Sequence, residues 1–234
     1  MIQSFLSSRK MISFEPSTHT YTVDDKPFTS VTTLLSTWFA KFDADKVIAK
    51  MKPTGKTPDE LKAEWEQKGK LAAELGTQLH QSIEAYFKGT PVPLDTVEYG
   101  YFIDFVDTNK LNTFQVEWCL YHEPTTLIGT IDYVSKRPDG SLDLYDWKRS
   151  SELSKGFGRC LLPELSHIPD SKYWKYTLQL NLYRFLAEEN GYKVNKMFIV
   201  CFHPSNLGFQ KLEVQVIDVK TILNKYRTTS TCGL

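Results

Sequence analysis

The sequence has little that would mark a membrane protein or a strongly charged binding protein. No apolar run approaches the ~20 residues that a transmembrane helix needs, so we expect no membrane partner. Lysine and arginine together number 28, as do aspartate and glutamate, and the 234 residues therefore carry a formal net charge of zero. No overall field attracts nucleic acid, and an anionic partner has to be bound locally.

Cysteine is also scarce, and its spacing excludes the common cysteine-based metal sites. No C-x-x-C pair occurs, which argues against a zinc ribbon and against an iron–sulfur cluster. Reduced thiols in an intracellular, reducing compartment are the expectation for such widely separated cysteines. The four residues are Cys119, Cys160, Cys201 and Cys232.

Signals for targeting and for ATP-driven motion are weak or missing. Residues 1–10 contain two basic and no acidic residues but lack the length and amphipathic period of an organellar presequence. A cytoplasmic or a phage- or virus-encoded protein is therefore favoured, with a mitochondrial location as the alternative. No G-x-x-x-x-G-K-[ST] motif occurs, so any ATP-driven helicase that takes part must be a separate chain.

What the sequence does contain is enough apolar material for a large domain. Hydrophobic residues make up 41% of the chain and aromatic residues 13%, enough to bury a sizeable core. The predicted elements are helices, a meander of strands, a helix, two strands and a helix, an order that predicts an α/β (α+β) fold with a central mixed sheet flanked by helices. Residues 1–57 are expected to form an N-terminal hairpin and helices that pack on a core of residues 58–234, together making one compact domain.

The clearest helix is predicted over residues 58–88. Thr57 can cap its first turn, and Pro58 favours the first helical position. One buried face is predicted from apolar residues at helical spacing, namely Leu61, Trp65, Ala72, Leu75, Leu79, Ile83 and Tyr86. The other predicted helices are 30–40, 42–51, 96–109, 172–190 and 218–226.

Alternating residues predict the strands. An opening hairpin is expected over 11–14 and 20–23. Residues 151–171, rich in glycine and proline, are expected to be a mobile loop. The remaining predicted strands are 113–121, 127–134, 141–147, 196–202 and 209–216.

The most informative stretch, 127–150, reads as a hairpin around Pro-Asp-Gly at 138–140. A three-residue loop there would pair Asp132 with Asp146, with Cβ atoms about 5 Å apart. Lys148 lies two residues beyond Asp146 and so on the same face, with Trp147 opposite. Two carboxylates this close repel each other unless a cation lies between them, which suggests a hard divalent metal site with a basic helper. Alone, a D-x-K triplet is more often a solvated face of a strand.

Two further patterns add to this stretch. G-T-Q-L-H ends at His80, with Glu84 one helical turn further on, and Gly76 at its start would allow close backbone approach. Q-L-N-L-Y places Gln179 and Tyr183 one turn apart on the 172–190 helix. Singly, each pattern is also compatible with an ordinary amphipathic helix.

In this order, the motifs G-T-x-L-H, G-T-I-D, D-W-K and Q-x-x-x-Y resemble the RecB-type branch of the PD-(D/E)XK nucleases. Within that branch they are similar to mitochondrial genome-maintenance exonucleases and to phage and viral nucleases. The resemblance covers about residues 71–185 and implies a restriction-endonuclease-like core. Some relatives hold a four-cysteine iron–sulfur cluster, whose spacing this chain lacks.

The resemblance implies a site that binds Mg²⁺ or Mn²⁺. Its metal ligands would be His80, Asp132, Asp146 and the backbone carbonyl of Trp147. Lys148 would be the catalytic lysine, acting with the two aspartates.

Further residues are expected around this centre. Glu117 falls where relatives often carry an acid, and with Glu84 it is expected to support the ligands from behind. The turn at 122–126 leaves open whether Glu117 points at the metal site. The residues expected to contact DNA are Gln179, Tyr183, Arg149, Ser150, Lys155, Arg159 and Lys175.

The first hypothesis is a metal-dependent DNA exonuclease that acts on single-stranded DNA or frayed ends in replication, repair or recombination. Its expected partner is a replication or recombination complex. One alternative is a DNA-end-binding module that keeps the nuclease fold without turnover. Another is a structure-specific endonuclease. The sequence leaves polarity and the choice between DNA and RNA open.

Overall fold

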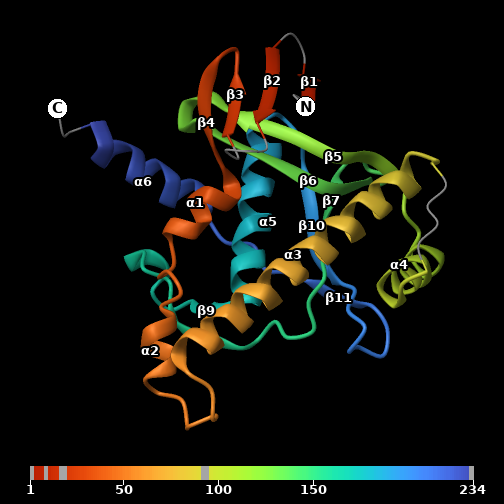
Figure 1. The fold of residues 1–234 in the computed structure, drawn as a ribbon. Helices are drawn as coiled ribbons and strands as arrows, with labels where there is room; N and C mark the ends of the chain where they lie inside the picture. Colours follow the sequence, from red (N-terminus) through yellow and green to blue (C-terminus); the bar gives the residue numbers. More distant parts are fainter. Residues whose placement is uncertain (1–2, 8–9, 16–19, 91–94, 232–234) are drawn as a thin grey trace.

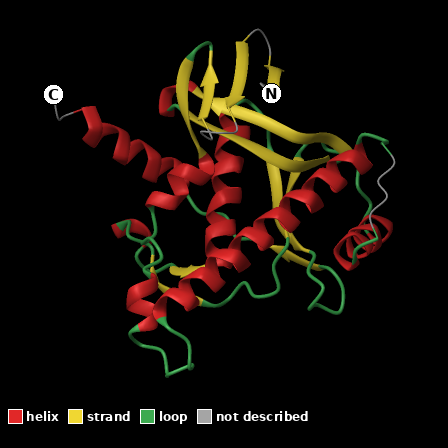
Figure 2. Cartoon of the chain, viewed as in Figure 1, coloured by secondary structure: helices red, strands yellow, loops and turns green. Residues whose placement is uncertain are grey.

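A mixed β-sheet runs through the molecule with helices packed around it (Figures 1 and 2). The computed structural model describes residues 3–7, 10–15, 20–90 and 95–231. The strands of the large sheet are β1 (Gln3–Ser7), β2 (Lys10–Glu15), β3 (Thr20–Val23), β4 (Lys26–Ser30), β5 (Thr113–His122), β6 (Leu127–Lys136), β7 (Leu142–Lys148), β10 (Val194–Cys201) and β11 (Gln210–Glu213).

The helices are of very different lengths. Two 3-10 turns, Glu123–Thr125 and Pro163–Leu165, join elements around the sheet. The α-helices are α1 (Val31–Thr37), α2 (Ala44–Ile48), α3 (Pro58–Phe87), α4 (Val97–Thr108), α5 (Lys172–Glu189) and α6 (Val219–Thr231).

The topology of the sheet creates a fork at β6. The strand order is β1-β2-β3-β4-β6-β7-β10-β11, and β5 pairs with β6 along the full length of one edge. On the other edge, β4 pairs in parallel with Leu127 and Ile128, whereas β7 pairs antiparallel with residues 133–136. Residues 129–132 of that edge are therefore paired with neither strand, and β6 is shared between two diverging partners.

Two packed layers cover the faces of the sheet. One joins α1, α5 and α6 to the sheet through aliphatic side chains such as Leu178 and Leu144, both 0% exposed. The other is largely aromatic and joins α3 and α4 to β6, β7 and β10; Trp147 lies at its centre, 5.6 Å from the ring of Phe105 between centroids. Rigid apolar layers on both faces hold the fork in place.

The local predictions are largely confirmed. Thr57 and Glu60 form the reciprocal capping box at the start of α3. Ser30 caps α1, which ends at Thr37, earlier than predicted. The predicted fold class is also confirmed, since the sheet is mixed and flanked by helices. Because β4 joins β6, the strands of residues 1–57 belong to the same sheet as the core; the division at residue 57 stays a prediction.

The expected buried stripe of α3 is wrong at Ala72, in the middle of the helix, and at Tyr86. Ala72 is exposed and Tyr86 is 38% exposed, whereas Leu61, Leu79 and Ile83 are buried. The reason is that α3 packs on α2 at one end and on α4 and β5 at the other, with little to cover its centre (Figure 1).

The segment 151–171 is more ordered in structure than its composition predicted. It contains a small antiparallel sheet of β8 (Gly156–Arg159) and β9 (Pro169–Ser171). A Cβ at Gly156 would lie 1.9 Å from the carbonyl oxygen of Asp170, so this close approach needs glycine. Among the described helices, none combines the length and apolar character needed to cross a membrane.

A pair of glycine substitutions tests this packing. A Cβ at Gly129 would lie 2.7 Å from Cε1 of Tyr183 and 2.9 Å from Cγ2 of Val31. We expect Gly129→Ala to lower the free energy of unfolding by about 1–3 kcal/mol, because α5 would have to move away from β6. Urea unfolding followed by circular dichroism measures this.

The control is Gly69→Ala in α3, where a Cβ meets nothing within 4 Å. This substitution should raise the free energy of unfolding by about 1 kcal/mol, since alanine favours a helix over glycine. Equal effects at the two glycines would contradict the packing described for β6 and α5.

Candidate active site

The fork places the two predicted aspartates at the point where β6 and β7 separate. The ladder between these strands ends at the pair Tyr133–Tyr145, and Asp132 and Asp146 are the next positions in that register. The predicted pairing register and three-residue loop are thus present: the backbone N–H of Arg137 donates to the carbonyl of Ser141, across residues 138–140. Beyond the ladder, Oδ2 of Asp132 accepts a hydrogen bond of 2.7 Å from the backbone N–H of Trp147.

Both β5 and β6 are distorted at this level. Glu117 has φ +48°, which is unusual for a side chain of this size, and the β5–β6 ladder pairs the residues on either side of Glu117 with those on either side of Asp132. Ile131 packs in the layer of α5, whereas Tyr133 packs in the layer of α3 and α4. The side-chain alternation therefore switches at Asp132, and the two acids meet at the distortion.

His80 reaches this point from α3. Its Nε2 lies 2.9 Å from the carbonyl oxygen of Trp147. A carbonyl only accepts, so Nε2 carries the proton and donates, which leaves Nδ1 of the neutral ring as a lone pair. That Nδ1 lies 3.8 Å from Oδ2 of Asp132. A histidine held in this way by a backbone carbonyl is oriented as metal-binding histidines usually are.

One group of side chains has the spacing of a metal site. Ligand atoms of His80, Glu117 and Asp132 lie within 4.8 Å of one another. Burial raises the pKa of the Glu117 carboxyl to about 9, and the neighbouring Asp132 adds to the shift. The structure thus brings Glu117, which was expected to lie behind the ligands, alongside His80 and Asp132.

Asp146 and Lys148 form a buried pair beside this group. Nζ of Lys148 lies 2.9 Å from both carboxylate oxygens of Asp146, and the contact with Oδ1 is a hydrogen bond. Burial raises the pKa of Asp146 to about 6, opposed by the charge of Lys148. Burial alone would lower the pKa of Lys148, but Asp146 and Asp132 outweigh it and raise that pKa above its ordinary value.

The donor set fits a hard divalent cation. Oδ2 of Asp146 is buried and makes no hydrogen bond, although Nζ of Lys148 lies 2.9 Å away; a buried carboxylate oxygen without a hydrogen bond is costly in a protein interior. Three acids of the described structure, Glu117, Asp132 and Asp146, meet here, and Lys148 is bonded to one of them, Asp146. Carboxylate oxygens suit Mg²⁺ and Mn²⁺, and the imidazole of His80 suits Mn²⁺ better than Mg²⁺. The roles of the individual residues stay predictions.

Two other residues of α3 that the sequence singled out, Glu84 and Gly76, lie outside the group of metal-ligand candidates. Glu84 forms a short ion pair with Lys88 one turn further on and lies near enough to Glu117 to help raise its pKa. A Cβ at Gly76 would meet nothing within 4 Å, so the expected close backbone approach there is wrong.

Gln179 and Tyr183 act as a pair on α5. Nε2 of Gln179 donates a hydrogen bond of 2.8 Å to the hydroxyl of Tyr183, whose side chain is buried against Gly129. Gln179 also lines a pocket between α1 and α5. Gln179 therefore borders the pocket and is bonded to the buried Tyr183, and the contacts of both residues with DNA stay predictions.

The predicted DNA contacts after β7 are engaged inside the protein. Nε of Arg149 donates to Oε1 of Glu98 at 2.6 Å, with 14% and 12% of the two side chains exposed. Ser150 is buried and accepts a hydrogen bond from Lys172. Glu98, on α4, was missed because its role depends on a tertiary contact that no local motif signals.

The remaining cationic candidates lie nearer to solvent. Lys155 pairs with Glu152 at 2.8 Å, and the exposed Arg159 donates to the carbonyl of His167 at 3.0 Å. Lys175 lines the same pocket as Gln179. Of the seven residues predicted to contact DNA, the structure thus brings Gln179 together with its hydrogen-bond partner Tyr183 and with Lys175, and places the other four elsewhere.

Comparisons with known proteins were made for the whole chain. The family model of the PD-(D/E)XK nuclease superfamily matches residues 94–229, which include β5, β6, β7 and α5. No curated protein matches the chain. Among solved structures, the crystal structure of SSO0001 is similar with a TM-score of 0.39 and 17% identity, covering 88% of this chain and 75% of that chain. His80 and α1 lie before the matched range.

The raised pKa of Glu117 predicts that metal affinity depends on pH. Without metal, Glu117 keeps its proton up to about pH 9, whereas a metal binds the ionised carboxylate. Binding between about pH 7 and 8.5 should therefore release about one proton, and Mn²⁺ affinity should rise about tenfold for each pH unit. Isothermal titration calorimetry at several pH values measures both quantities.

Glu117→Gln is the matched comparison, because glutamine has nearly the same shape but no proton to release. Its metal affinity should change little with pH over this range. A slope equal to that of the unaltered protein would show that Glu117 takes no part in metal binding.

Proposed function

The chain belongs to the PD-(D/E)XK nuclease superfamily, and we propose that it is a DNA exonuclease of the RecB-like branch. PD-(D/E)XK nucleases use divalent metals, and the cofactor proposed here is Mg²⁺ or Mn²⁺. The observation that carries the proposal is the convergence of His80, Asp132 and the Asp146–Lys148 pair at the fork between β6 and β7. The order of the four motifs supports the RecB-like branch.

Each residue of the site has a definite chemical task. His80, Asp132, Asp146 and the Trp147 carbonyl would hold the cation, with Glu117 as a further ligand. When bound, the cation lowers the pKa of a coordinated water and stabilises charge that develops on the phosphoryl group.

Lys148 provides the fixed positive charge. Because its pKa is raised, it stays an ammonium at neutral pH, and its three N–H groups can orient the attacking water and balance charge on the scissile phosphate. The buried Asp146 and the ring of Tyr176, 4.7 Å from Nζ, limit where this charge can move. Gln179, held by Tyr183, would position the strand.

Single-stranded DNA or frayed ends are the proposed substrate, in replication, repair or recombination. A chain with no net charge is poorly suited to a broad duplex footprint, because duplex binding depends on many phosphate contacts. The free, buried thiols of Cys119, Cys160 and Cys201 suit the proposed reducing compartment; Cys232 lies outside the described residues. Any helicase activity would come from a partner in the same complex.

Substitutions of the buried pair test catalysis directly. We expect Asp146→Ala and Lys148→Ala each to reduce cleavage of single-stranded DNA by at least about 10²–10³-fold, because each removes charge stabilisation from the reacting phosphate. Loss of a fluorescent end label with Mg²⁺ or Mn²⁺ gives the rates. Lys148→Met keeps most of the side-chain volume, so it should remove the charge and still fold if Lys148→Ala does not.

The control is Lys196→Ala, which removes a surface lysine paired with Glu213 at 2.7 Å. It should cleave at the normal rate, and circular dichroism should show the same fold in all variants. Undiminished cleavage by the folded Asp146 and Lys148 variants would refute the proposed nuclease site. DNA binding without metal-dependent shortening in the unaltered protein would instead favour the non-catalytic end-binding module.

A separate experiment tests the exonuclease assignment. Linear single-stranded DNA should be degraded with Mg²⁺ or Mn²⁺, whereas covalently closed circular single strands should stay intact, because an exonuclease needs an end. Gel electrophoresis of both substrates in one reaction measures this, and strands labelled at the 5′ or the 3′ end give the polarity. Cutting of the circle would favour the endonuclease alternative.

A further inference from the structure

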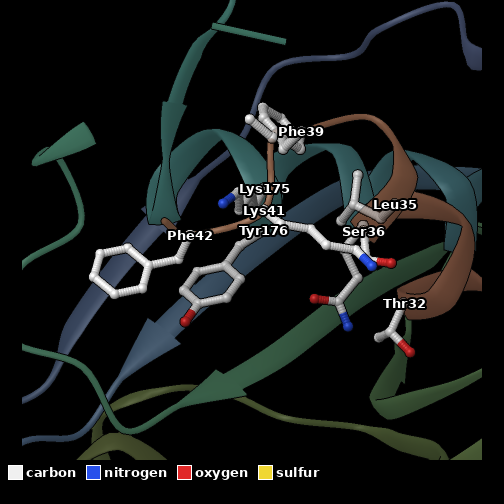
Figure 3. A pocket seen from close by; sticks show the side chains of 10 residues that line it. Thr32, Leu35, Ser36, Phe39, Lys41, Phe42, Lys175 and Tyr176 are labelled. Carbon is white, nitrogen blue, oxygen red and sulfur yellow. The ribbon is translucent and has the colours of Figure 1, made fainter. Parts of the chain in front are cut away.

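A pocket of about 360 Å³ lies between α1, the segment 38–43 that follows it, and α5. Its volume is within the range of ligand pockets, about 300–1,000 Å³. Figure 3 shows the rings of Phe42 and Tyr176 towards one end of the pocket and Thr32 towards the other. The lining residues are Thr32, Leu35, Ser36, Phe39, Ala40, Lys41, Phe42, Lys175, Tyr176 and Gln179.

We propose that this pocket binds one unpaired nucleobase of the substrate strand, next to the nucleotide that is cleaved. This inference rests on the proposed function and specifies its substrate: the strand must present a base that is free of a pairing partner. The family match begins at residue 94, so the α1 side of the pocket lies outside the matched part of the chain.

The lining has the chemistry that a base requires. Phe42 is 71% exposed even though its ring makes an edge-to-face contact with Trp65, with centroids 5.8 Å apart, whereas Phe39 and Leu35 are buried and form an apolar floor. Stacking on aromatic side chains is the common way for proteins to hold single-stranded bases. An aromatic ring that stays in solvent at the mouth of a pocket is costly in water and is suited to such stacking.

A polar end complements the rings. Gln179 uses its Nε2 to donate a hydrogen bond to the hydroxyl of Tyr183. Its Oε1 makes no hydrogen bond to the described residues and can accept one from an amino group on the edge of a base. In a duplex that edge is engaged by the partner base, and the flat faces are covered by neighbours, so only an unpaired base can enter.

Two lysines at the pocket are placed to bind the phosphates of a nucleotide strand. Lys41 has no ion-pair partner among the residues that the structure describes. Lys175 is held in place by Asp170 at 2.6 Å and lies 4.9 Å from the centre of the Phe39 ring. A pocket lined by aromatic and apolar side chains, with two cations at its side, matches a nucleotide better than it matches an apolar peptide side chain.

Tyr176 lies between the pocket and the proposed site of cleavage. It lines the pocket, and Nζ of Lys148 lies 4.7 Å from the centre of its ring. Lys148 is in turn bonded to Asp146. A base stacked beside Tyr176 would therefore place its own backbone close to the proposed reacting phosphate.

Fluorescence of 2-aminopurine tests the pocket without cleavage. A single-stranded oligonucleotide with 2-aminopurine near its end is titrated with the protein in EDTA, and stacking of that base should quench its fluorescence. Phe42→Ala should weaken the quenched complex about 5- to 100-fold, as expected when one base loses its stacking partner. A blunt duplex with the same base should show no quenching.

The matched control is Leu207→Ala, which removes a fully exposed apolar side chain outside the pocket and should leave the quenching unchanged. With Mg²⁺ or Mn²⁺, Phe42→Ala should raise KM for single-stranded DNA more than it lowers kcat, and circular dichroism verifies its fold. The proposal is overturned if Phe42→Ala quenches like the unaltered protein, or if the duplex is quenched equally.

The two proposals fail in different ways. Quenching that depends on Phe42 in a protein that never shortens DNA would support the pocket and refute the exonuclease. Normal cleavage with no base-specific quenching would refute the pocket and leave the exonuclease standing.

Discussion

The hydrogen bond from the backbone N–H of Trp147 to the carboxylate of Asp132 is the interaction on which the site depends. It takes the place of a strand-to-strand bond where β6 and β7 separate. The carbonyl of the same residue accepts from His80, so one peptide segment joins two proposed ligands. Its indole ring, buried among the aromatic residues of α3 and α4, keeps that segment from shifting. Packing of the aromatic layer thereby helps to fix the polar geometry of the site.

Electrostatics explain why such a site needs cations. Three carboxyl groups meet in a largely buried region, and burial raises the pKa of Glu117 to about 9 and that of Asp146 to about 6. Either protons or positive charges have to offset this concentration of acid. Lys148 supplies one permanent charge at the side of Asp146, and a divalent ion would supply the remainder. The same arrangement that costs stability without metal would provide affinity for it.

Much of this fold could be predicted from local sequence patterns. The features that could not be predicted depend on contacts between distant parts of the chain. The capping box of Thr57 and the register that brings Asp132 level with Asp146 follow from short-range rules on helix starts and three-residue turns. The left-handed backbone of Glu117 could not be predicted, because it depends on how β5 pairs with β6 around Asp132. The exposed centre of α3 and the pocket beside Gln179 likewise depend on how distant elements pack.

Anomalous diffraction from crystals soaked in Mn²⁺ would test the central claim most directly. The account predicts a manganese peak at the fork, with an oxygen of Asp132, an oxygen of Glu117 or Asp146, and Nδ1 of His80 each about 2 Å from the ion. The peak should disappear in crystals of an Asp132→Ala variant. A fully occupied peak elsewhere, with none at the fork, would contradict the proposal that the fork is the metal site.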